Sequence, residues 1–253
     1  MSSVRLISRT CAVLDVLAGP PVGVTALAAR VGLPKSTTGR LLQAMAEEGL
    51  VEQVTGGTDY RLGSRVTAWA AAVRPSRSLV AVAQPHLRAL AAATGEASGL
   101  TVAEGAFVNH LLQEEGSPHP VLVRDWTGTR SPMHATAPGL VFLSRFGAAE
   151  LDAYLAGPLE SLASGTMTDA AQLRARLARV RVAGYAMTRD EVGEGISSIA
   201  APIVDGSGAV AGCAHVHWPT YRFPDADSPA VAAIRDRVIA TAVAIGEDLA
   251  RGA

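Results

Sequence analysis

Cysteine, lysine and aromatic residues are scarce in this chain of 253 residues. The two cysteines, Cys11 and Cys213, lack the Cys-x-x-Cys spacing and predict no disulfide framework, so a reducing cytoplasm is the expected location. No window of about 18 uninterrupted apolar residues is present, which argues against a transmembrane helix. No apolar run follows the first arginines either, so we expect no signal peptide and no membrane partner.

A large excess of charge of one sign is also missing, since the formal net charge is −1. The charge is nevertheless uneven: residues 1–75 hold eight Lys and Arg against five Asp and Glu (+3), and the remainder holds fourteen against eighteen (−4). Lys35 is the only lysine, and every other basic residue is an arginine. A mildly basic first part on an acidic remainder suits a DNA reader with a separate sensing or assembly domain.

The segment 24–62 has the pattern of a helix-turn-helix followed by a hairpin. A first short helix is predicted from Thr25, as its N-cap, to about Val31, and Gly32 breaks it. Pro34 suits the start of a second helix, where its missing N–H costs nothing. Polar and basic residues crowd the beginning of that helix, as in helices that meet base edges and phosphates in the major groove. The candidate DNA contacts on it are Lys35, Ser36, Thr37, Thr38 and Arg40.

Two short strands, 50–54 and 60–62, follow the second helix around the turn 55–59 and predict a wing. Arg61 and Arg65 are expected near the backbone of the DNA. Helix-turn-helix geometry also occurs in domains that bind no DNA, so a small helical bundle with a hairpin is the alternative. The hydroxyl and basic cluster together with the wing favours double-stranded operator DNA as the partner.

Helical periodicity flanks this segment on both sides. A first helix is predicted over 4–18, and a second over 64–73, rich in alanine and suited to pack against its twin in a dimer. Residues 74–78 break that second helix. The chain is therefore predicted to consist of a winged helix-turn-helix domain (1–63), a linker helix (64–78) and a larger domain (79–253).

The larger domain alternates between strand and helix patterns. Apolar–polar alternation predicts strands, and 3.6-residue periodicity predicts helices that cover an antiparallel sheet, so the fold class is α+β. The predicted strands are 98–104, 107–113, 121–123, 184–187, 196–204 and 209–217. The predicted helices are 79–94, 138–146, 149–155, 170–183 and 230–250.

Three motifs, in this order and spacing, resemble the IclR family of bacterial transcriptional regulators. They are GLPKSTTGRLLQAMAEEGLVEQ with YRLG in the first domain, GTRSPMHATA at 128–137, and GYAMTRDEVGEGISSIAAPIVDGSGAVAGC at 184–213. The resemblance implies a winged helix-turn-helix, a GAF-like effector-binding domain, and homodimers that pair into tetramers. It also implies control of catabolic or specialised-metabolism genes, by repression more often than by activation.

The strand around Cys213, His215 and His217 places these three side chains on one face, because side chains alternate along a strand. The resemblance puts effector contacts at two of them and on neighbouring segments, with backbone amides of the loop Ala137-Pro138 and of the helix start at Gly139 facing a carboxylate. Pro138 has no N–H, which weakens that anion contact. The candidate effector contacts are Met133, Ala137, Pro138, Gly139, Leu140, Thr188, Ser198, His215 and His217, and each of them has an ordinary core role as its alternative.

Other chemistries have weaker support. Cys213, His215 and His217 span about 13 Å along one strand, too far for one zinc ion, although a pair of them with His134 or Glu194 leaves a metal-dependent sensor open. A DNA-tethered enzyme with a histidine base, or a body that serves only for assembly, is also compatible with the pattern. No catalytic motif and no cofactor are predicted. Trp126 and Trp218 flank the predicted pocket and are candidates to cover an apolar ligand.

Overall fold

The computed structural model describes residues 3–54, 56–72, 79–116, 125–223 and 225–251. Its contacts group the chain into two compact units, Met1–Pro75 and Ser76–Ala253, which we call the head and the body. The strand predicted at 121–123 and the break predicted at 74–78 lie outside the described residues. None of the helices in the described part is long and apolar enough to cross a membrane.

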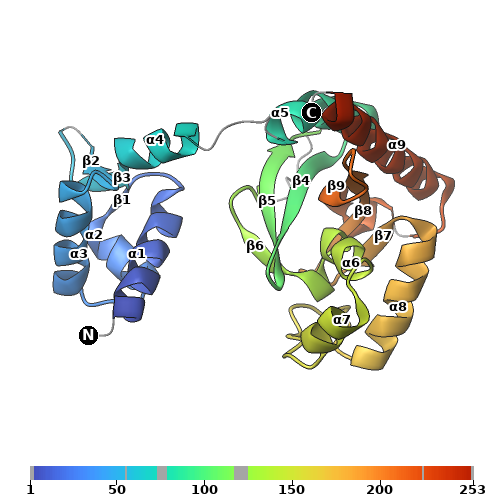
Figure 1. Ribbon diagram of the computed structural model, residues 1–253, viewed down its shortest axis with the longest axis horizontal. Helices are drawn as coiled ribbons and strands as arrows, with labels where there is room; N and C mark the ends of the chain where they lie inside the picture. Colours follow the sequence, from blue (N-terminus) through green and yellow to red (C-terminus); the bar gives the residue numbers. More distant parts are fainter. Residues whose placement is uncertain (1–2, 55, 73–78, 117–124, 224, 252–253) are drawn as a thin grey trace. The chain divides into compact units, whose positions relative to one another are not determined.

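The head is a small helical unit with a three-stranded sheet of order β1-β3-β2 (Figure 1). Its helices pack through a core that includes Val13, Leu17, Leu27, Leu42 and Met45. In chain order its elements are α1 (Ser3–Leu17), β1 (Val22–Gly23), α2 (Val24–Arg30), α3 (Lys35–Glu47), β2 (Val51–Gln53), β3 (Asp59–Leu62) and α4 (Ser64–Ala72).

The turn between α2 and α3 follows from two residues. Gly32 has a φ of 64°, a left-handed conformation that glycine adopts at little cost. Pro34 occupies the N-cap of α3, one residue before the predicted position, and its carbonyl accepts the Thr38 amide at 2.9 Å. The prediction of Thr25 as the N-cap of α2 is wrong, because the helix begins at Val24 and Gly23 caps it.

The body is built on one antiparallel sheet of six strands in the order β6-β5-β4-β9-β8-β7 (Figure 1). The strands are β4 (Ala97–Glu104), β5 (Phe107–Glu114), β6 (Arg130–Pro132), β7 (Ala186–Arg189), β8 (Ile196–Val204) and β9 (Val210–Pro219). The helices are α5 (Leu79–Thr94), α6 (Ala137–Leu143), α7 (Ala148–Leu155), α8 (Ala170–Ala183) and α9 (Pro229–Arg251), with short 3₁₀ helices η1 (Met133–Ala135) and η2 (Thr220–Arg222).

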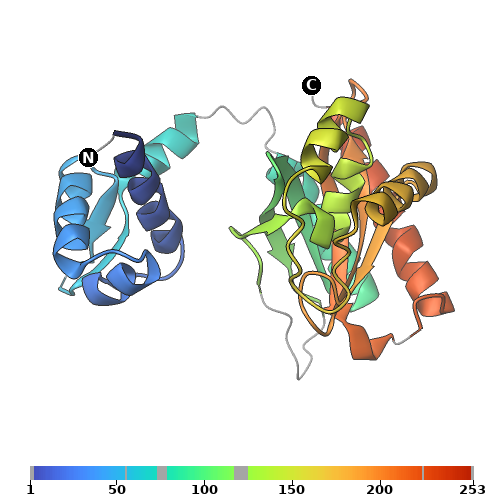
Figure 2. The ribbon, with the colours of Figure 1, turned by 90° about the horizontal axis from the view of Figure 1, so that it is seen from below.

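Helices cover both faces of the sheet (Figure 2). Helices α5 and α9 pack on one face through a core that contains Leu87, Leu100, Val216 and Ile245. Helices α6, α7 and α8 cover the other face, where Leu140 and Leu177 meet Ala200 and Cys213. The predicted α+β architecture, a helix-turn-helix head followed by an antiparallel sheet flanked by helices, is confirmed.

Candidate functional sites

The outer face of α3 carries most of the predicted DNA contacts. Lys35, Ser36 and Arg40 are exposed and Thr37 is half-buried, while Leu42 and Met45 anchor the opposite face in the head core. Among the residues that the structure describes, no carboxylate forms an ion pair with Lys35 or Arg40. Both cations are therefore available to a polyanion.

Thr38 does not belong to this exposed set. Its side chain is fully buried, and its hydroxyl donates to the Pro34 carbonyl at 3.2 Å. Position 38 lies on the inner face of α3, next to the buried Leu42 one turn later. The prediction of Thr38 as a DNA contact is thus corrected: its hydroxyl closes the first turn of the helix.

The two wing-side arginines are exposed but held by acidic neighbours. Arg61 on β3 pairs with Glu52 on β2 at 2.6 Å, directly across the ladder. Arg65 on α4 reaches Glu48 at 2.5 Å and also donates to the Glu48 carbonyl. Because these pairs are exposed, each contributes little stability and can be exchanged for a phosphate contact at modest cost.

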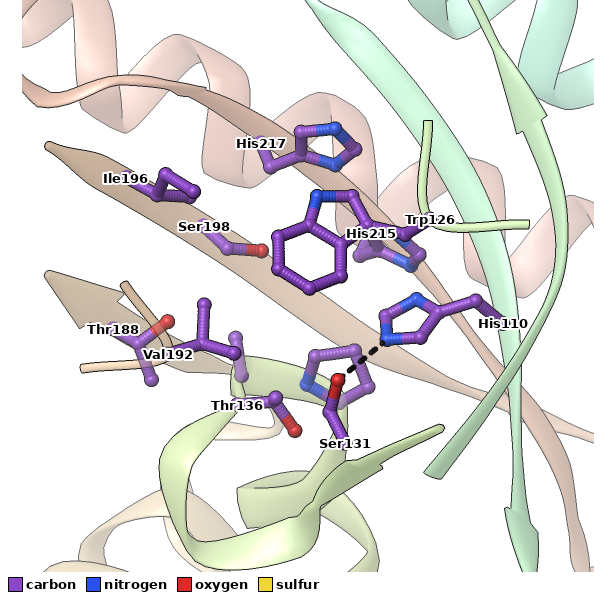
Figure 3. Close-up of a pocket in the computed structure, with 12 residues that line it drawn as sticks. His110, Trp126, Ser131, Thr136, Thr188, Val192, Ile196, Ser198, His215 and His217 are labelled. Atoms are coloured by element: carbon purple, nitrogen blue, oxygen red, sulfur yellow. Dashed lines mark hydrogen bonds between the residues drawn. The ribbon is translucent and has the colours of Figure 1, made fainter. Parts of the chain in front are cut away.

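A small pocket opens on the α6 side of the body sheet (Figure 3). Three of its residues form one cross-strand row, because Thr188 on β7 pairs with Ser198 on β8, and Ser198 pairs with His217 on β9. The sheet register thus brings together residues that the sequence separates by up to 29 positions. The full lining is His110, Trp126, Ser131, Thr136, Ala137, Pro138, Thr188, Val192, Ile196, Ser198, His215 and His217.

Three imidazoles gather on one side of this pocket, with the Trp126 indole beside them (Figure 3). The ring centroids of His215 and His217 lie 5.6 Å apart in a stacked arrangement, and those of His110 and His215 lie 5.8 Å apart, edge to face. Gly99 pairs with His215 across the β4–β9 ladder and leaves room for its ring, since a Cβ there would lie 2.6 Å from it.

Hydrogen bonds fix two of the three rings. His215 Nδ1 lies 3.0 Å from the Thr101 hydroxyl, which is fully buried, and His110 Nε2 lies 3.4 Å from the Ser131 hydroxyl. His110 Nδ1 and His217 Nε2 are buried, and no described residue offers either a hydrogen-bond partner. Unpaired buried polar atoms are costly in a folded protein, so these two nitrogens are suited to a bound molecule.

The histidine cluster is neutral near pH 7. Burial lowers the pKa of His110 to about 4, and burial with the nearby His110 does the same to His217. Burial also lowers the pKa of His215 well below its usual value, and the two neighbouring imidazoles act in the same direction. The pocket lining contains no Lys, Arg, Asp or Glu side chain among the described residues.

The start of α6 offers fewer amides than the sequence led us to expect: of residues 137–139, the Ala137 amide is the one that no cap bond among the described residues uses. Thr136 is the N-cap, and its hydroxyl accepts the Gly139 amide at 3.1 Å. The Leu140 amide donates to the Thr136 carbonyl, and Pro138 has no N–H. The prediction that the Gly139 amide meets a ligand carboxylate is therefore wrong, because the helix cap already uses it.

A pinned loop between β7 and β8 closes one wall of the pocket. Asp190 has a φ of 54°, and its carboxylate accepts the Gly195 amide at 2.7 Å. Arg176 of α8 makes a bidentate pair with Glu191 at 2.7 and 2.8 Å, with both side chains largely buried. These contacts hold the loop in place and so fix the position of Val192 in the pocket wall.

Six of the nine predicted effector contacts line the pocket, and three do not. Met133, Gly139 and Leu140 are buried on the side of η1 and α6 that faces the protein core. Trp218 is also a core residue, because it follows His217 on β9 and points to the α5–α9 face. The six that line it are Ala137, Pro138, Thr188, Ser198, His215 and His217.

Five lining residues went unpredicted: His110, Ser131, Thr136, Val192 and Ile196. His110 left a weak signal, because in the strand 107–113 it lies two residues from Val108 and two from Leu112 and so shares a face with apolar side chains. The remaining four come from a three-residue strand, a helix cap, a loop and the first position of a strand, where no periodicity shows which way a side chain points.

The two residues considered as additional metal ligands are occupied elsewhere. His134 lies 3.1 Å from the Tyr154 hydroxyl and 2.9 Å from the Glu160 carbonyl, and Glu194 accepts from Ser164 at 2.7 Å. Across the described ranges, no group of three or more His, Cys, Asp or Glu is arranged to hold a metal ion.

Two family models match the chain. The model described as the bacterial transcriptional regulator IclR C-terminal covers residues 71–246, and the IclR helix-turn-helix domain covers residues 6–55. Together they span the head helices that carry the predicted DNA contacts and nearly all of the body that contains the pocket.

Individual proteins are similar over most of the chain. The glycerol operon regulatory protein of Streptomyces griseus is 31% identical over 99% of this chain and 98% of its own length. The transcriptional repressor IclR of Escherichia coli K12 is 29% identical, over 73% of this chain and 68% of its own length. A crystal structure of an IclR homolog from Microbacterium hydrocarbonoxydans, complexed with 4-hydroxybenzoate, is 26% identical with a TM-score of 0.80, covering 98% of this chain and 100% of that one.

Proposed function

The chain belongs to the IclR family of bacterial transcriptional regulators, and from this premise we propose that it is a repressor whose affinity for operator DNA depends on a small molecule bound in the body pocket. One observation supports the proposal that the protein responds to a ligand: His110 Nδ1 and His217 Nε2 are buried, and no described residue forms a hydrogen bond with either nitrogen. The effector is a polar or carboxylate-containing metabolite, in keeping with the 4-hydroxybenzoate bound to a similar protein.

The head contacts the DNA through α3 and the wing. In this proposal Lys35 and Arg40 contact phosphates or guanine edges. Ser36 and Thr37 set the position of α3 in the major groove. Arg61 and Arg65 contact the DNA backbone next to that groove. The supporting observation is that the outer face of α3 is exposed and basic.

The assembly is a homodimer, or a dimer of dimers, reading a pseudo-palindromic site in the cytoplasm. Effector binding changes operator affinity by a coupling free energy between the pocket and the heads. A named repressor among the relatives supports the sign of regulation.

Catalysis is not part of this proposal. Ser131 and His110 are the one nucleophile–base pair that the described pocket lining offers, but His110 Nδ1 has no orienting partner among the described residues. With its pKa lowered to about 4, His110 is also a weak base. Turnover of a bound small molecule would contradict this conclusion.

Replacing Arg40 by Ala tests the DNA-reading role of α3. We expect operator affinity to fall by about 1–3 kcal/mol, and the slope of log affinity against log salt to decrease by about 1 if a phosphate contact is lost. The measurement is binding to DNA upstream of the protein's own gene, at two salt concentrations and against scrambled competitor.

Arg179→Ala is the matched control for Arg40→Ala. Arg179 is exposed on α8, so its replacement removes the same charge from the body instead of the head. If both variants bind the operator as the unchanged protein does, α3 does not read the DNA. If both lose the same affinity, only net charge matters and sequence-specific reading by Arg40 is disproved.

A further inference from the structure

The body pocket is lined mostly by apolar surface with a few hydrogen-bond donors, and its described lining holds no fixed positive charge. We propose that it binds a compact carboxylic acid together with one proton, which an imidazole of the His110–His215–His217 cluster takes up as the acid enters. This inference rests on the proposed effector role of the pocket, and it adds the charge state in which the effector is held.

The available donors follow from the hydrogen-bond partners already assigned. The Thr136 hydroxyl accepts the Gly139 amide, which leaves its own hydrogen to donate. When the Ser131 hydroxyl donates to His110 Nε2, the neutral His110 ring carries its hydrogen on Nδ1, the nitrogen without a partner among the described residues. With His217 Nε2 as a second such nitrogen, the pocket can offer several N–H and O–H groups to the oxygens of one ligand.

The usual sources of positive charge for a carboxylate are missing from the described lining. It contains no Lys or Arg, and the cap residue and the proline at the start of α6 leave the Ala137 amide, a neutral donor, as the one amide of residues 137–139 for an anion. A carboxylate held there by neutral donors alone would be a buried charge without a counterion, which is strongly unfavourable.

Protonation of the cluster supplies that counterion. A proton taken from solvent onto one imidazole gives the ring two N–H groups, so His110⁺ would donate through Nδ1 to the carboxylate and through Nε2 to the Ser131 hydroxyl. The rings lie 5.6 and 5.8 Å apart, so a second imidazolium would be repelled and the cluster takes up one proton as a unit.

The remaining titratable or charged groups around the cluster do not replace this proton. The exposed Asp125 favours the charged form of His217 and so assists uptake, without neutralising an anion. The Cys213 thiol beneath Pro138 stays neutral because burial raises its pKa well above the usual value. The indole of Trp126 and the hydroxyls of Ser131, Thr136, Thr188 and Ser198 carry no charge.

A dependence of affinity on pH follows. Free imidazoles with pKa values near 4 are neutral between pH 6 and 8, and a carboxylic acid is ionised there. Binding therefore takes up one proton, and the association constant of the acid falls by up to tenfold for each unit rise in pH. A neutral amide of the same shape takes up no proton, so its affinity stays level.

Calorimetry of the full-length protein tests this directly. The probes are benzoate and 4-hydroxybenzoate, with benzamide and 4-hydroxybenzamide as neutral counterparts, titrated at pH 6, 7 and 8 in pairs of buffers with different ionisation enthalpies. We expect uptake of about one proton per acid bound, up to a hundredfold weaker acid binding at pH 8 than at pH 6, and no slope for the amides.

Matched variants locate the proton. His110→Gln combined with His217→Gln should abolish most of the proton uptake, whereas His86→Gln should leave it unchanged, because His86 lies outside the pocket and pairs with Asp248.

Three results would each overturn the inference. They are acid binding without proton uptake, binding of the amides while neither acid binds, and no acid binding at pH 6 with 10 mM acid. If a bound compound alters operator affinity without proton uptake, the proposed function stands and this inference alone fails.

Discussion

Gly99 is the residue on which the position of the His215 ring depends most directly. It stands opposite His215 in the β4–β9 ladder, and an added Cβ would lie 2.6 Å from the ring and 2.9 Å from the Leu112 carbonyl. The imidazole can rotate away only by giving up its bond to Thr101, and the Leu112 backbone cannot move without disturbing the β4–β5 ladder.

We therefore expect Gly99→Ala to destabilise the protein by about 1–3 kcal/mol through overpacking and to weaken binding of any pocket ligand. Urea denaturation gives the free energy of unfolding. Gly206→Ala is the control, since a Cβ there would make ordinary contacts with Ala250, and its effect should stay within about 0.5 kcal/mol. Equal effects of the two substitutions would show that Gly99 is not a close-packed position.

Single residues also show where sequence reasoning reaches its limit. Alternation along β9 correctly placed Cys213, His215 and His217 on one face, because the strand period fixes which face a side chain takes. The same reasoning could not exclude Thr38 or Leu140, since a motif locates a segment but not the face of a short helix that meets solvent or ligand.

Helix α8 links local sequence signals to the pocket wall. Its predicted bounds, 170–183, match the structure, because both ends carry strong signals: the Asp169 carboxylate accepts the Gln172 amide at 2.8 Å, and Gly184 ends the helix with a φ of 76°. From its middle, Arg176 reaches Glu191 in the loop that positions Val192.

Removing the cap should loosen α8 measurably. Asp169→Ala leaves the Gln172 amide without its side-chain acceptor, and we expect a loss of about 1 kcal/mol in the free energy of unfolding. Asp169→Asn keeps an acceptor oxygen and should change stability by only a few tenths of a kcal/mol, because Asn caps about as well as Asp. Thermal or urea denaturation of both variants is the measurement, and identical losses would show that charge, not the cap bond, is what matters.

Elements that form through long-range pairing were predicted with less detail than α8. Strand β8 was predicted with its observed bounds, 196–204, and the hairpin turn at 205–208 indicates β9 as one neighbour, but nothing local to β8 shows that β7 is the other. The row formed by Thr188, Ser198 and His217 depends on that pairing. The family resemblance predicted these three residues as effector contacts, whereas His110 on β5 lies in none of the motifs that carry the resemblance.

At the scale of the whole molecule, histidine is confined to one of the two units. All six histidines lie after residue 85, so the body holds every one of them and the head holds none. In the folded body, burial lowers the pKa of His110 and His217 from 6.5 to about 4. Between pH 6.5 and 4 the unfolded chain therefore binds protons that the folded body does not bind. The folding stability that is present above pH 6.5 is lost as the pH falls towards 4.

Acid should accordingly destabilise the body through this cluster. We expect the free energy of unfolding to fall between pH 6.5 and about 4 by up to about 1.4 kcal/mol per pH unit for each of the three buried histidines, since burial lowers the pKa of His215 as well. A Trp69→Phe variant removes the exposed indole of the head, so the fluorescence of Trp126 and Trp218 then reports urea unfolding of the body at pH 7, 6 and 5. Adding His217→Gln should lower the slope by about a third because one of the three buried imidazoles is gone, and a slope unchanged by that substitution would place the acid sensitivity outside the pocket.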